Sequence, residues 1–384
     1  MHLVTEFIAV LTLAVWLYLI AARGAFWRAP DDDDVHAPSP AVWPRVTAVI
    51  PARDEADHIG PTLRSLLTQD YAGPFSIVLV DDGSRDGTAA AAKAEARALN
   101  AESRLRVIDG APPPAGWTGK LWAVNQGVAE AEAGAPDYLL LTDADIVYAP
   151  GTLTWLVARA QAKGTVLTSL MAQLRCESLA ERALIPAFIF FFRMLYPFAW
   201  VSRRDRTTAA AAGGCMLARR EALSRAGGIA AIRGALIDDC ALARAMKKQG
   251  PIDLALTHRV RSTRGYAGFG DIRRMVARSA YAQLRYSPLL LLGTVAGLTL
   301  TYLAPVGLAL FANGLPQALG ALTWLLMAAA FQPVLRFYRL SPAWGLALPF
   351  IASTYMVFTV DSAYQHAQGR GGMWKGRAQA NVSG

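Results

Sequence analysis

Long uncharged apolar runs stand at both ends of this 384-residue chain. Residues 7–22 carry no charge, and three further uncharged runs occupy 288–312, 315–335 and 342–360. These three contain 25, 21 and 19 residues, and a helix of about 20 apolar residues crosses the ~30 Å hydrocarbon core of a bilayer. We therefore expect an N-terminal transmembrane anchor at 1–28 and a C-terminal transmembrane region at 288–363, with about three segments.

The first apolar run has a cleaved signal peptide as its alternative interpretation. A signal peptide needs a basic start and a small-residue cleavage site. Here Glu6 is the only charged side chain before the run, whereas Arg23 and Arg28 follow it. Basic residues on that flank favour an uncleaved anchor whose following domain is cytoplasmic.

The basic tail at 364–384 conflicts with this topology. Three successive spans that start from a cytoplasmic domain would place the tail outside, yet basic residues prefer the cytoplasmic side. Either the run at 342–360 is re-entrant or the charge rule fails here, and both interpretations stay open.

Between residues 45 and 265 the hydrophobic pattern alternates strand and helix. Strands are predicted at 46–51, 77–80, 105–109, 138–142 and 166–175, and helices at 59–67, 88–99, 121–133 and 150–163. Strands separated by helices imply a parallel sheet with right-handed crossovers. We expect an α/β domain at 45–265, in which helices flank a mostly parallel sheet. A Pro- and Asp-rich linker at 29–44 precedes it, and its four aspartates are expected to form a solvated spacer rather than a cation site.

Two segments have the pattern of interfacial elements. The apolar, aromatic segment 184–201 is interrupted by Pro186, Arg193 and Pro197, which favours an amphipathic element in the membrane interface over a spanning helix. A core helix is the alternative. Residues 266–287, with four arginines among apolar side chains, predict a second amphipathic interface helix.

The net charge and the cysteines narrow the range of expected partners and compartments. The net charge of +9 is compatible with nucleic-acid binding, but no aromatic-basic binding module is present, so no nucleic-acid partner is expected. Beside apolar runs, attraction to anionic lipid headgroups explains the charge better. The three cysteines, Cys176, Cys215 and Cys240, show no CxxC spacing, which fits a reducing compartment.

Acidic residues follow the ends of the predicted strands. They are Asp54 and Glu55 after the first strand, Asp81 and Asp82 after the second, and Asp143 and Asp145 after the fourth. Open α/β sheets bind ligands at the carboxyl ends of their strands. Carboxylate oxygens there suit a divalent cation that holds a diphosphate. The order of these segments predicts a nucleotide-activated substrate.

The series VIPARDE, VDDGSRDGT, GKLWAVNQG, TDAD and IDDCALA resembles family 2 glycosyltransferases with the GT-A fold. The resemblance covers about residues 45–265 and implies a metal-dependent hexosyltransferase of the EC 2.4 class. It also implies a set of donor-binding residues: Pro51, Ala52, Asp54, Glu55, Asp82, Lys120, Asp143 and Gly214. Asp145 and Asp143 match the family's ligands for Mg²⁺ or Mn²⁺, with Asp145 the principal ligand.

The acidic pair Asp238 and Asp239 matches the family's catalytic base. A carboxylate can take the proton of an acceptor hydroxyl as it attacks, and a metal opposite it can neutralise the departing diphosphate. This arrangement describes a direct displacement with inversion at the sugar carbon. We favour Asp239 as the base and keep Asp238 as the alternative. Helix capping by one of the two is the structural alternative. For Asp81 and Asp86, turn stabilisation is as reasonable as ligand contact.

Within the family, three features resemble the bacterial hopene-associated glycosyltransferases: the anchor, the segment ALIPAFIFFFRMLYPFAW and the segment AYAQLRYSP. This resemblance implies sugar transfer, with a UDP-sugar as the expected donor, to a hopanoid or related isoprenoid-derived lipid. It also implies a multi-pass protein of the bacterial inner membrane with a cytoplasmic catalytic domain. The WKGR string at 374–377 is similar to the tails of transferases that act on isoprenoid-derived lipids.

Other functions are less well supported by the sequence. A polysaccharide synthase would carry QxxRW after the acidic pair, and a nucleotidyltransferase would need a glycine-rich loop after the first strand; this chain has neither. A polyisoprenyl-phosphate or sphingolipid-type sugar transferase differs only in its acceptor and stays open. An inactive scaffold is disfavoured because Asp82, Asp143, Asp145 and Asp239 are all present.

Overall fold

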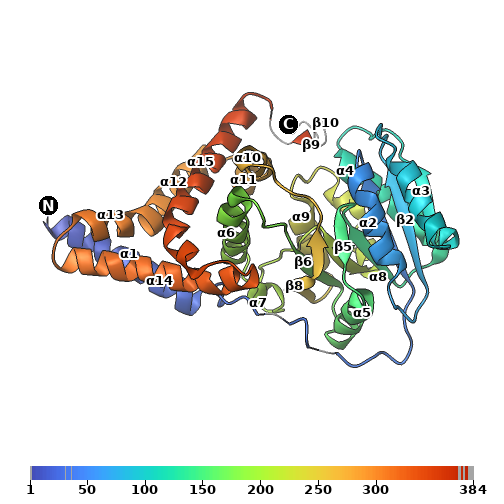
Figure 1. Ribbon diagram of the computed structural model, residues 1–384, viewed down its shortest axis with the longest axis horizontal. Coiled ribbons are helices and arrows are strands. Elements are labelled where there is room, and N and C mark those ends of the chain that lie inside the picture. Colours follow the sequence, from blue (N-terminus) through green and yellow to red (C-terminus); the bar gives the residue numbers. More distant parts are fainter. Residues whose placement is uncertain (1, 31, 36, 371–372, 375–376, 379–384) are drawn as a thin grey trace. The chain divides into compact units, whose positions relative to one another are not determined.

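A computed structural model describes residues 2–30, 32–35, 37–370, 373–374 and 377–378 (Figure 1). These residues divide into two units. Unit 1 holds the described residues of Met1–Ala29, Cys176–Ala199 and Gly265–Gly372, and unit 2 those of Pro30–Arg175, Trp200–Arg264 and Met373–Gly384. The predicted strand–helix region therefore contributes to both units, because residues 176–199 leave unit 2 and join the apolar helices.

Unit 2 contains an eight-stranded sheet with the order β3-β2-β1-β4-β7-β6-β8-β5. Its strands are β1 Val46–Ala52, β2 Phe75–Asp81, β3 Leu105–Asp109, β4 Tyr138–Thr142, β5 Ile146–Tyr148, β6 Leu167–Gln173, β7 Cys215–Arg219 and β8 Ile252–Ser262. The pairs among β1 to β4 and the pair β6–β8 are parallel, whereas β4–β7, β6–β7 and β5–β8 are antiparallel. The predicted α/β class and the five predicted strands are confirmed. The sheet is mixed because β7, between β4 and β6, and β5, next to β8, run antiparallel to their neighbours.

Helices connect and cover the strands of unit 2. They are α2 Ala56–Leu67, α3 Thr88–Ala98, α4 Gly119–Ala131, α5 Thr152–Ala162, α8 Arg220–Arg225 and α9 Asp238–Lys247. Helix α4 begins where the Thr118 hydroxyl accepts a hydrogen bond from the Leu121 amide, as an N-cap residue does. The four helices predicted here are confirmed, with ends that differ by a few residues.

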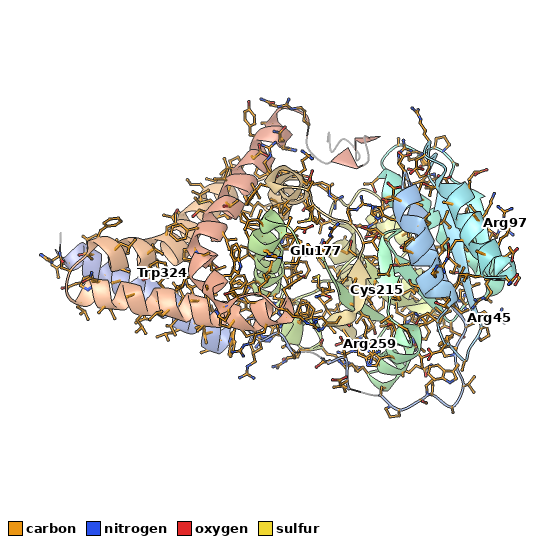
Figure 2. All side chains as sticks on the ribbon, viewed as in Figure 1. Arg45, Arg97, Glu177, Cys215, Arg259 and Trp324 are labelled. Carbon is orange, nitrogen blue, oxygen red and sulfur yellow. The ribbon has the colours of Figure 1, made fainter. Side chains whose placement is uncertain are left out.

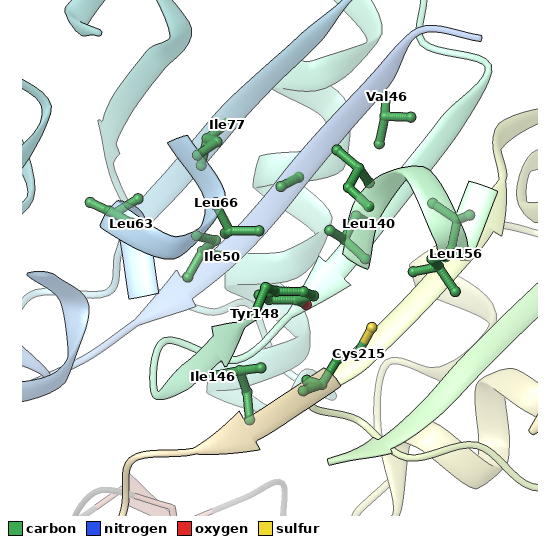
Figure 3. Close-up of a cluster of buried hydrophobic side chains, with 14 of the residues drawn as sticks. Val46, Ile50, Leu63, Leu66, Ile77, Leu140, Ile146, Tyr148, Leu156 and Cys215 are labelled. Atoms are coloured by element: carbon green, nitrogen blue, oxygen red, sulfur yellow. The ribbon is translucent and has the colours of Figure 1, made fainter. Parts of the chain in front are cut away.

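Helices pack on both faces of the sheet, and the side chains of β1 alternate between the two faces. Successive side chains of a strand point to opposite faces; Val46 and Ile50 belong to one buried cluster with Leu63 and Leu66 of α2 (Figure 3). On the other face, α4 comes so close to β1 that a Cβ added to Gly127 would lie 2.5 Å from Cγ1 of Val49. The sheet is thus covered on both faces, and ligands have access at the ends of its strands.

The acidic linker before β1 contacts β8 and α5. The Asp33 carboxylate accepts hydrogen bonds from the Thr257 hydroxyl and, at 2.7 Å, from the His258 amide. Arg259 (Figure 2) donates to the Asp33 carbonyl oxygen, and Arg159 lies 3.3 Å from the Asp32 carboxylate. The expectation of a solvated spacer is therefore wrong for Asp33, whose side chain is 14% exposed, because β8 supplies donors that the local sequence does not reveal. The Asp32 side chain is 39% exposed. Asp31 lies outside the described residues.

Unit 1 consists of helices, most of them apolar. They are α1 His2–Ala22, α6 Leu179–Leu195, α10 Phe269–Ala277, α11 Ala280–Gln283, α12 Pro288–Leu298, the π-helix η4 Thr299–Leu303, α13 Ala304–Phe311, α14 Leu315–Phe337, the 3-10 helix η5 Pro342–Ala347 and α15 Leu348–Ala367. A short helix α7, Phe198–Val201, follows α6. By length and composition five described helical segments could cross a membrane: His2–Ala22, Leu179–Val201, Pro288–Phe311, Leu315–Phe337 and Pro342–Ala367.

Helix α6 differs from the expectation that proline interrupts it. A capping box of Ser178 and Glu181 starts the helix, and Pro186 lies inside it without ending it; the helix stops at Leu195, before Pro197. Arg193 is 3% exposed, and it donates to the carbonyl oxygens of residues 26 and 28. Conversely, Arg23 donates to the carbonyl oxygens of residues 194 and 195. The ends of α1 and α6 are thus joined by two arginines that each satisfy carbonyl groups at or just beyond the other helix end.

The C-terminal tail contains a short antiparallel pair. Strand β9, Met373–Trp374, pairs with β10, Arg377–Ala378. Lys375 and Gly376 of the WKGR string lie outside the described residues.

Gly127→Ala tests the close approach of α4 to the sheet. The added Cβ would meet Val49 at 2.5 Å and Val80 at 3.0 Å, and overpacking of this kind costs about 1–3 kcal/mol. Alanine's helix preference over glycine recovers at most about 1 kcal/mol, so we expect a lower midpoint of thermal unfolding in detergent. Gly134→Ala, where no atom lies within 4 Å, is the control. A midpoint for Gly127→Ala at or above that of the unmodified protein would contradict the packing described.

Candidate active site

Two carboxylates follow strand β4 at the edge where the parallel strands end. Asp143 and Asp145 lie between the end of β4 and the start of β5, and their side chains are 34% and 13% exposed. Thr62 of α2 donates to the carbonyl oxygen of Ala144, at 2.8 Å, which fixes the backbone between them. Helix α2 thereby sets the position of both acids.

Lys120 bridges Asp143 and the acidic pair of α9. Its Nζ lies 2.9 Å from Oδ1 of Asp143 and 3.1 Å from Oδ2 of Asp238. Burial by itself would lower the pKa of Lys120, but the two carboxylates outweigh it and raise that pKa. The amine is therefore a fixed cation in this site. The pKa of Asp143 is raised because burial and the neighbouring carboxylates outweigh the effect of Lys120.

Arg264 forms a second bridge, which the sequence did not reveal. Its Nη2 lies 2.6 and 2.7 Å from the two carboxylate oxygens of Glu55, and its Nε lies 3.0 Å from Oδ2 of Asp145. Arg264 follows β8, a strand that was not predicted, and β8 meets Asp145 only because it pairs with β5. Glu55, expected in the nucleoside pocket, is thus held next to the expected metal ligand.

Asp239 is held by two backbone amides. Gly213 donates to its Oδ2 at 3.2 Å, and Cys240 donates to its Oδ1 at 2.6 Å. Both aspartates of the pair lie inside the first turn of α9, and Ile237 takes the N-cap position without a side-chain cap, so helix capping does not account for them. Burial, followed by the charge of Asp238, raises the pKa of Asp239 to about 6.

The expected nucleoside-binding residues lie at the ends of β1 and β2. Asp54 has a φ of +50°, in a left-handed region that non-glycine residues rarely adopt. Its amide donates to the Ser84 hydroxyl and its carboxylate accepts from the Arg85 amide. Asp82 is 2% exposed, with Arg53 3.7 Å from its carboxylate. These bonds hold the acidic turns after the two neighbouring strands together.

The turn-forming alternative is confirmed for two further aspartates. Oδ1 of Asp81 accepts a hydrogen bond from the Ser84 amide, at 2.9 Å. Asp86 accepts bonds from the amides of Thr88 and Ala56. Both carboxylates therefore shape the turn between β2 and α3.

A pocket in unit 2 collects several of the expected residues. It is lined by Pro51, Lys120, Leu121, Val124, Leu141, Thr142, Asp143, Gly213, Met216, Ile229, Ile232, Asp238 and Leu242. Ala52, the last residue of β1, is fully buried in the cluster that β1 forms with α2 and is not among the residues that line this pocket. Gly214 instead presents its carbonyl oxygen to the Thr142 hydroxyl, at 2.8 Å, which ties the segment before β7 to the end of β4. Acids, a cation and apolar walls thus meet at one end of the sheet.

The donor set fits a divalent metal that is shared with a ligand. Among the residues that the structure describes, no group of three or more His, Cys, Asp or Glu side chains could hold a metal ion by itself. Within that part of the chain, Oδ1 of Asp145 and Oδ2 of Asp143 receive no hydrogen bond. Mg²⁺ is commonly bound by one or two carboxylates together with substrate phosphates, and these two oxygens suit that mode.

Comparison with known proteins identifies the class. A family model described as "Glycosyltransferase like family 2" matches residues 44–281, more than half of the chain. The chain belongs to this family, as the sequence motifs predicted. A mannosyltransferase from Pyrobaculum calidifontis, solved with GDP-Man and Mn²⁺, has the same fold, with a TM-score of 0.57 and 20% identity over 95% of this chain and 99% of that one.

Two curated relatives match shorter stretches. An N-acetylglucosaminyltransferase of Mesorhizobium japonicum is 31% identical over 153 residues, 38% of this chain and 33% of that protein. A 4,4'-diaponeurosporenoate glycosyltransferase of Staphylococcus aureus is 32% identical over 103 residues, 27% of this chain and 24% of that protein. The chain therefore matches only about a quarter to a third of the length of these relatives.

Proposed function

We propose that this protein transfers a sugar, with inversion, from a nucleotide-sugar to a lipid acceptor at the membrane. The carrying observation is that Asp143, Lys120 and Asp238 form one connected group, with Asp239 beside Asp238. A proton acceptor and the expected diphosphate-binding residues are thereby close to the same pocket. Family membership supports the reaction class.

The donor is bound at the ends of β1, β2 and β4. In this proposal Asp54 and Asp82 accept hydrogen bonds from a base and its ribose, and a UDP-sugar is the donor. Asp145 and Asp143 would hold Mg²⁺ or Mn²⁺, which supplies Lewis-acid neutralisation of the departing diphosphate. The free oxygens of these two carboxylates support this assignment, and so does the Mn²⁺ bound by the solved mannosyltransferase.

Asp239 acts as the base that takes the proton of the acceptor hydroxyl. Its carboxylate is oriented by the Gly213 amide and is not bound by Lys120. Asp238 is bound by Lys120, so one of its carboxylate oxygens is already engaged in an ion pair. With the base on the acceptor side and Lys120 on the donor side, a single displacement inverts the sugar carbon.

The acceptor is a hopanoid or a related isoprenoid-derived lipid. The five long apolar helices support an acceptor drawn from the bilayer, and burying its apolar surface is favourable by about 25 cal/mol per Å². One relative is named for 4,4'-diaponeurosporenoate, a carotenoid lipid. We place the protein in the bacterial inner membrane with unit 2 on the cytoplasmic side, as Arg23 and Arg28 after the first apolar run favour.

A transfer assay on the full chain in lipid nanodiscs tests this proposal. With Mn²⁺ and a panel of UDP- and GDP-sugars, we expect labelled sugar to appear in a hopanoid glycolipid, because the carboxylates need a metal to bind the diphosphate. EDTA should abolish transfer and added Mn²⁺ should restore it. Polyisoprenyl phosphate and ceramide are the competing acceptors. Labelling of either one instead of the hopanoid would reassign the acceptor. Transfer that survives EDTA would contradict the proposed requirement for a metal ion.

Asp239→Asn should reduce kcat by about 10²–10⁴-fold, the usual contribution of a general base. Nucleotide binding, measured by calorimetry with Mn²⁺, should stay near that of the unmodified protein because the amide keeps the shape of the side chain. Asp57→Asn, which alters an exposed acid of α2, is the control. If Asp238→Asn lost more activity than Asp239→Asn, the base would be Asp238.

The pH profile of kcat/KM tests the same residue independently. A base works only when it has lost its proton, and the pKa of Asp239 is raised from 3.8 to about 6 by burial and Asp238, against the opposing charge of Lys120. We therefore expect kcat/KM to fall as the pH drops below about 6 and to level off above it. Asp238→Asn should move the fall to lower pH, because one raising charge is gone. A rate that stays constant down to pH 4.5 would contradict this assignment.

A further inference from the structure

Each of the two proposed metal ligands has its own basic partner. Lys120 contacts Asp143 and Arg264 contacts Asp145. Each cation is also shared with a second acid, because Lys120 reaches Asp238 and Arg264 reaches Glu55. The site is therefore built from two acid–cation–acid bridges that lie beside each other.

The Arg264 guanidinium is held in the site by a buried acid. Both carboxylate oxygens of Glu55 are bound to its Nη2, and the Glu55 side chain is only 9% exposed. Loss of this partner would take two hydrogen bonds from a buried carboxylate, which is destabilising. Glu55 thus keeps the guanidinium beside Asp145, and so acts on Asp145 through Arg264.

The bridge uses only one oxygen of Asp145. Arg264 and the Ser262 hydroxyl both bind Oδ2, at 3.0 and 3.1 Å, while Oδ1 receives no hydrogen bond from the described part of the chain. A metal bound at Oδ1 would therefore share its carboxylate with a guanidinium. The repulsion between these two cations weakens metal binding unless further negative charge arrives.

The diphosphate of the donor would supply that charge. The two bridges contain four carboxylates and two cations, a net charge of −2 when all are ionised. Without the two cations the same four carboxylates would carry a net charge of −4, which would attract a divalent ion more strongly. With the cations in place, phosphate oxygens become necessary both as ligands and as counter-charge.

We infer that Arg264 is a positioning residue that makes metal binding conditional on the nucleotide. Its positive charge at Asp145 lowers the affinity of the free protein for the metal, and the negative charge of a bound nucleotide raises that affinity. The inference rests on the proposed function, because it assigns the metal to Asp143 and Asp145. It concerns the order in which ligands bind, which a transfer assay alone does not reveal.

Mn²⁺ binding to the full chain in nanodiscs tests the inference, with electron paramagnetic resonance reporting free Mn²⁺. We expect the unmodified protein to bind Mn²⁺ weakly alone and more tightly with UDP or GDP. Arg264→Gln should bind Mn²⁺ alone about tenfold more tightly, the order expected when one nearby charge is removed. The gain from adding nucleotide should shrink correspondingly, a change that a merely structural role of Arg264 would not produce.

Three further variants make the result specific. Arg264→Lys keeps the charge and should resemble the unmodified protein. Arg261→Gln removes the same charge from an exposed position on β8 and should leave Mn²⁺ binding unchanged. The double variant Glu55→Gln/Arg264→Gln removes the buried acid together with its arginine, so it carries the test if Arg264→Gln does not fold. It should also bind Mn²⁺ more tightly, because the cation that contacts Asp145 is the one removed.

The outcomes separate this inference from the proposed function. If nucleotide and Mn²⁺ bind together normally but Arg264→Gln and the double variant bind Mn²⁺ alone no more tightly than the unmodified protein, the role inferred for Arg264 is overturned and the proposed function stands. If the unmodified protein binds neither UDP nor GDP with Mn²⁺, the proposed function falls and this inference with it.

Discussion

The concentration of negative charge at one end of the sheet is the constraint on which the site depends. Parallel strands bring their carboxyl ends to one edge, and the chain places acids after β1, β2 and β4 at that edge. Like charges this close disfavour ionisation of one another. Lys120 and Arg264 offset part of this charge, because each of them binds two of the acids. The same bonds tie α4, α9, β8 and the turn before α2 to the end of β4.

Much of unit 2 could be predicted because its signals are local. An apolar run that ends in Asp143 and Asp145 shows both the strand and the position of the acids, and the same holds for β1 and β2. Strands β5, β7 and β8 were not predicted. Strand β5 has only three residues, β7 follows a run of alanines and glycines, and His258, Arg259 and Arg261 interrupt the apolar pattern of β8. None of the three gives a clear apolar pattern.

Arg264 and Asp33 show why the remainder could not be predicted. Arg264 is separated by 209 residues from Glu55 and by 119 from Asp145, so nothing near it in sequence marks it as part of a site. The acidic linker looked solvated for the same reason, because its partners Thr257 and Arg259 follow more than 220 residues later. A basic residue just after a strand is the only local signal, and it is common in surface loops. Both sets of contacts depend on where β8 lies, and that is fixed by its pairing with β5 and β6, which are distant in sequence.

The reciprocal arginines at the ends of α1 and α6 limit how the protein can be shortened. Arg193 is buried and directs its guanidinium to carbonyl oxygens that follow the first helix. A chain that began after residue 28 would retain this buried cation but lose the carbonyl groups that accept its hydrogen bonds. Such a truncation would destabilise unit 1, because the hydrogen bonds of a buried charged group are costly to lose. The segment that follows the first helix is therefore a structural component of unit 1 and not only a connection to β1.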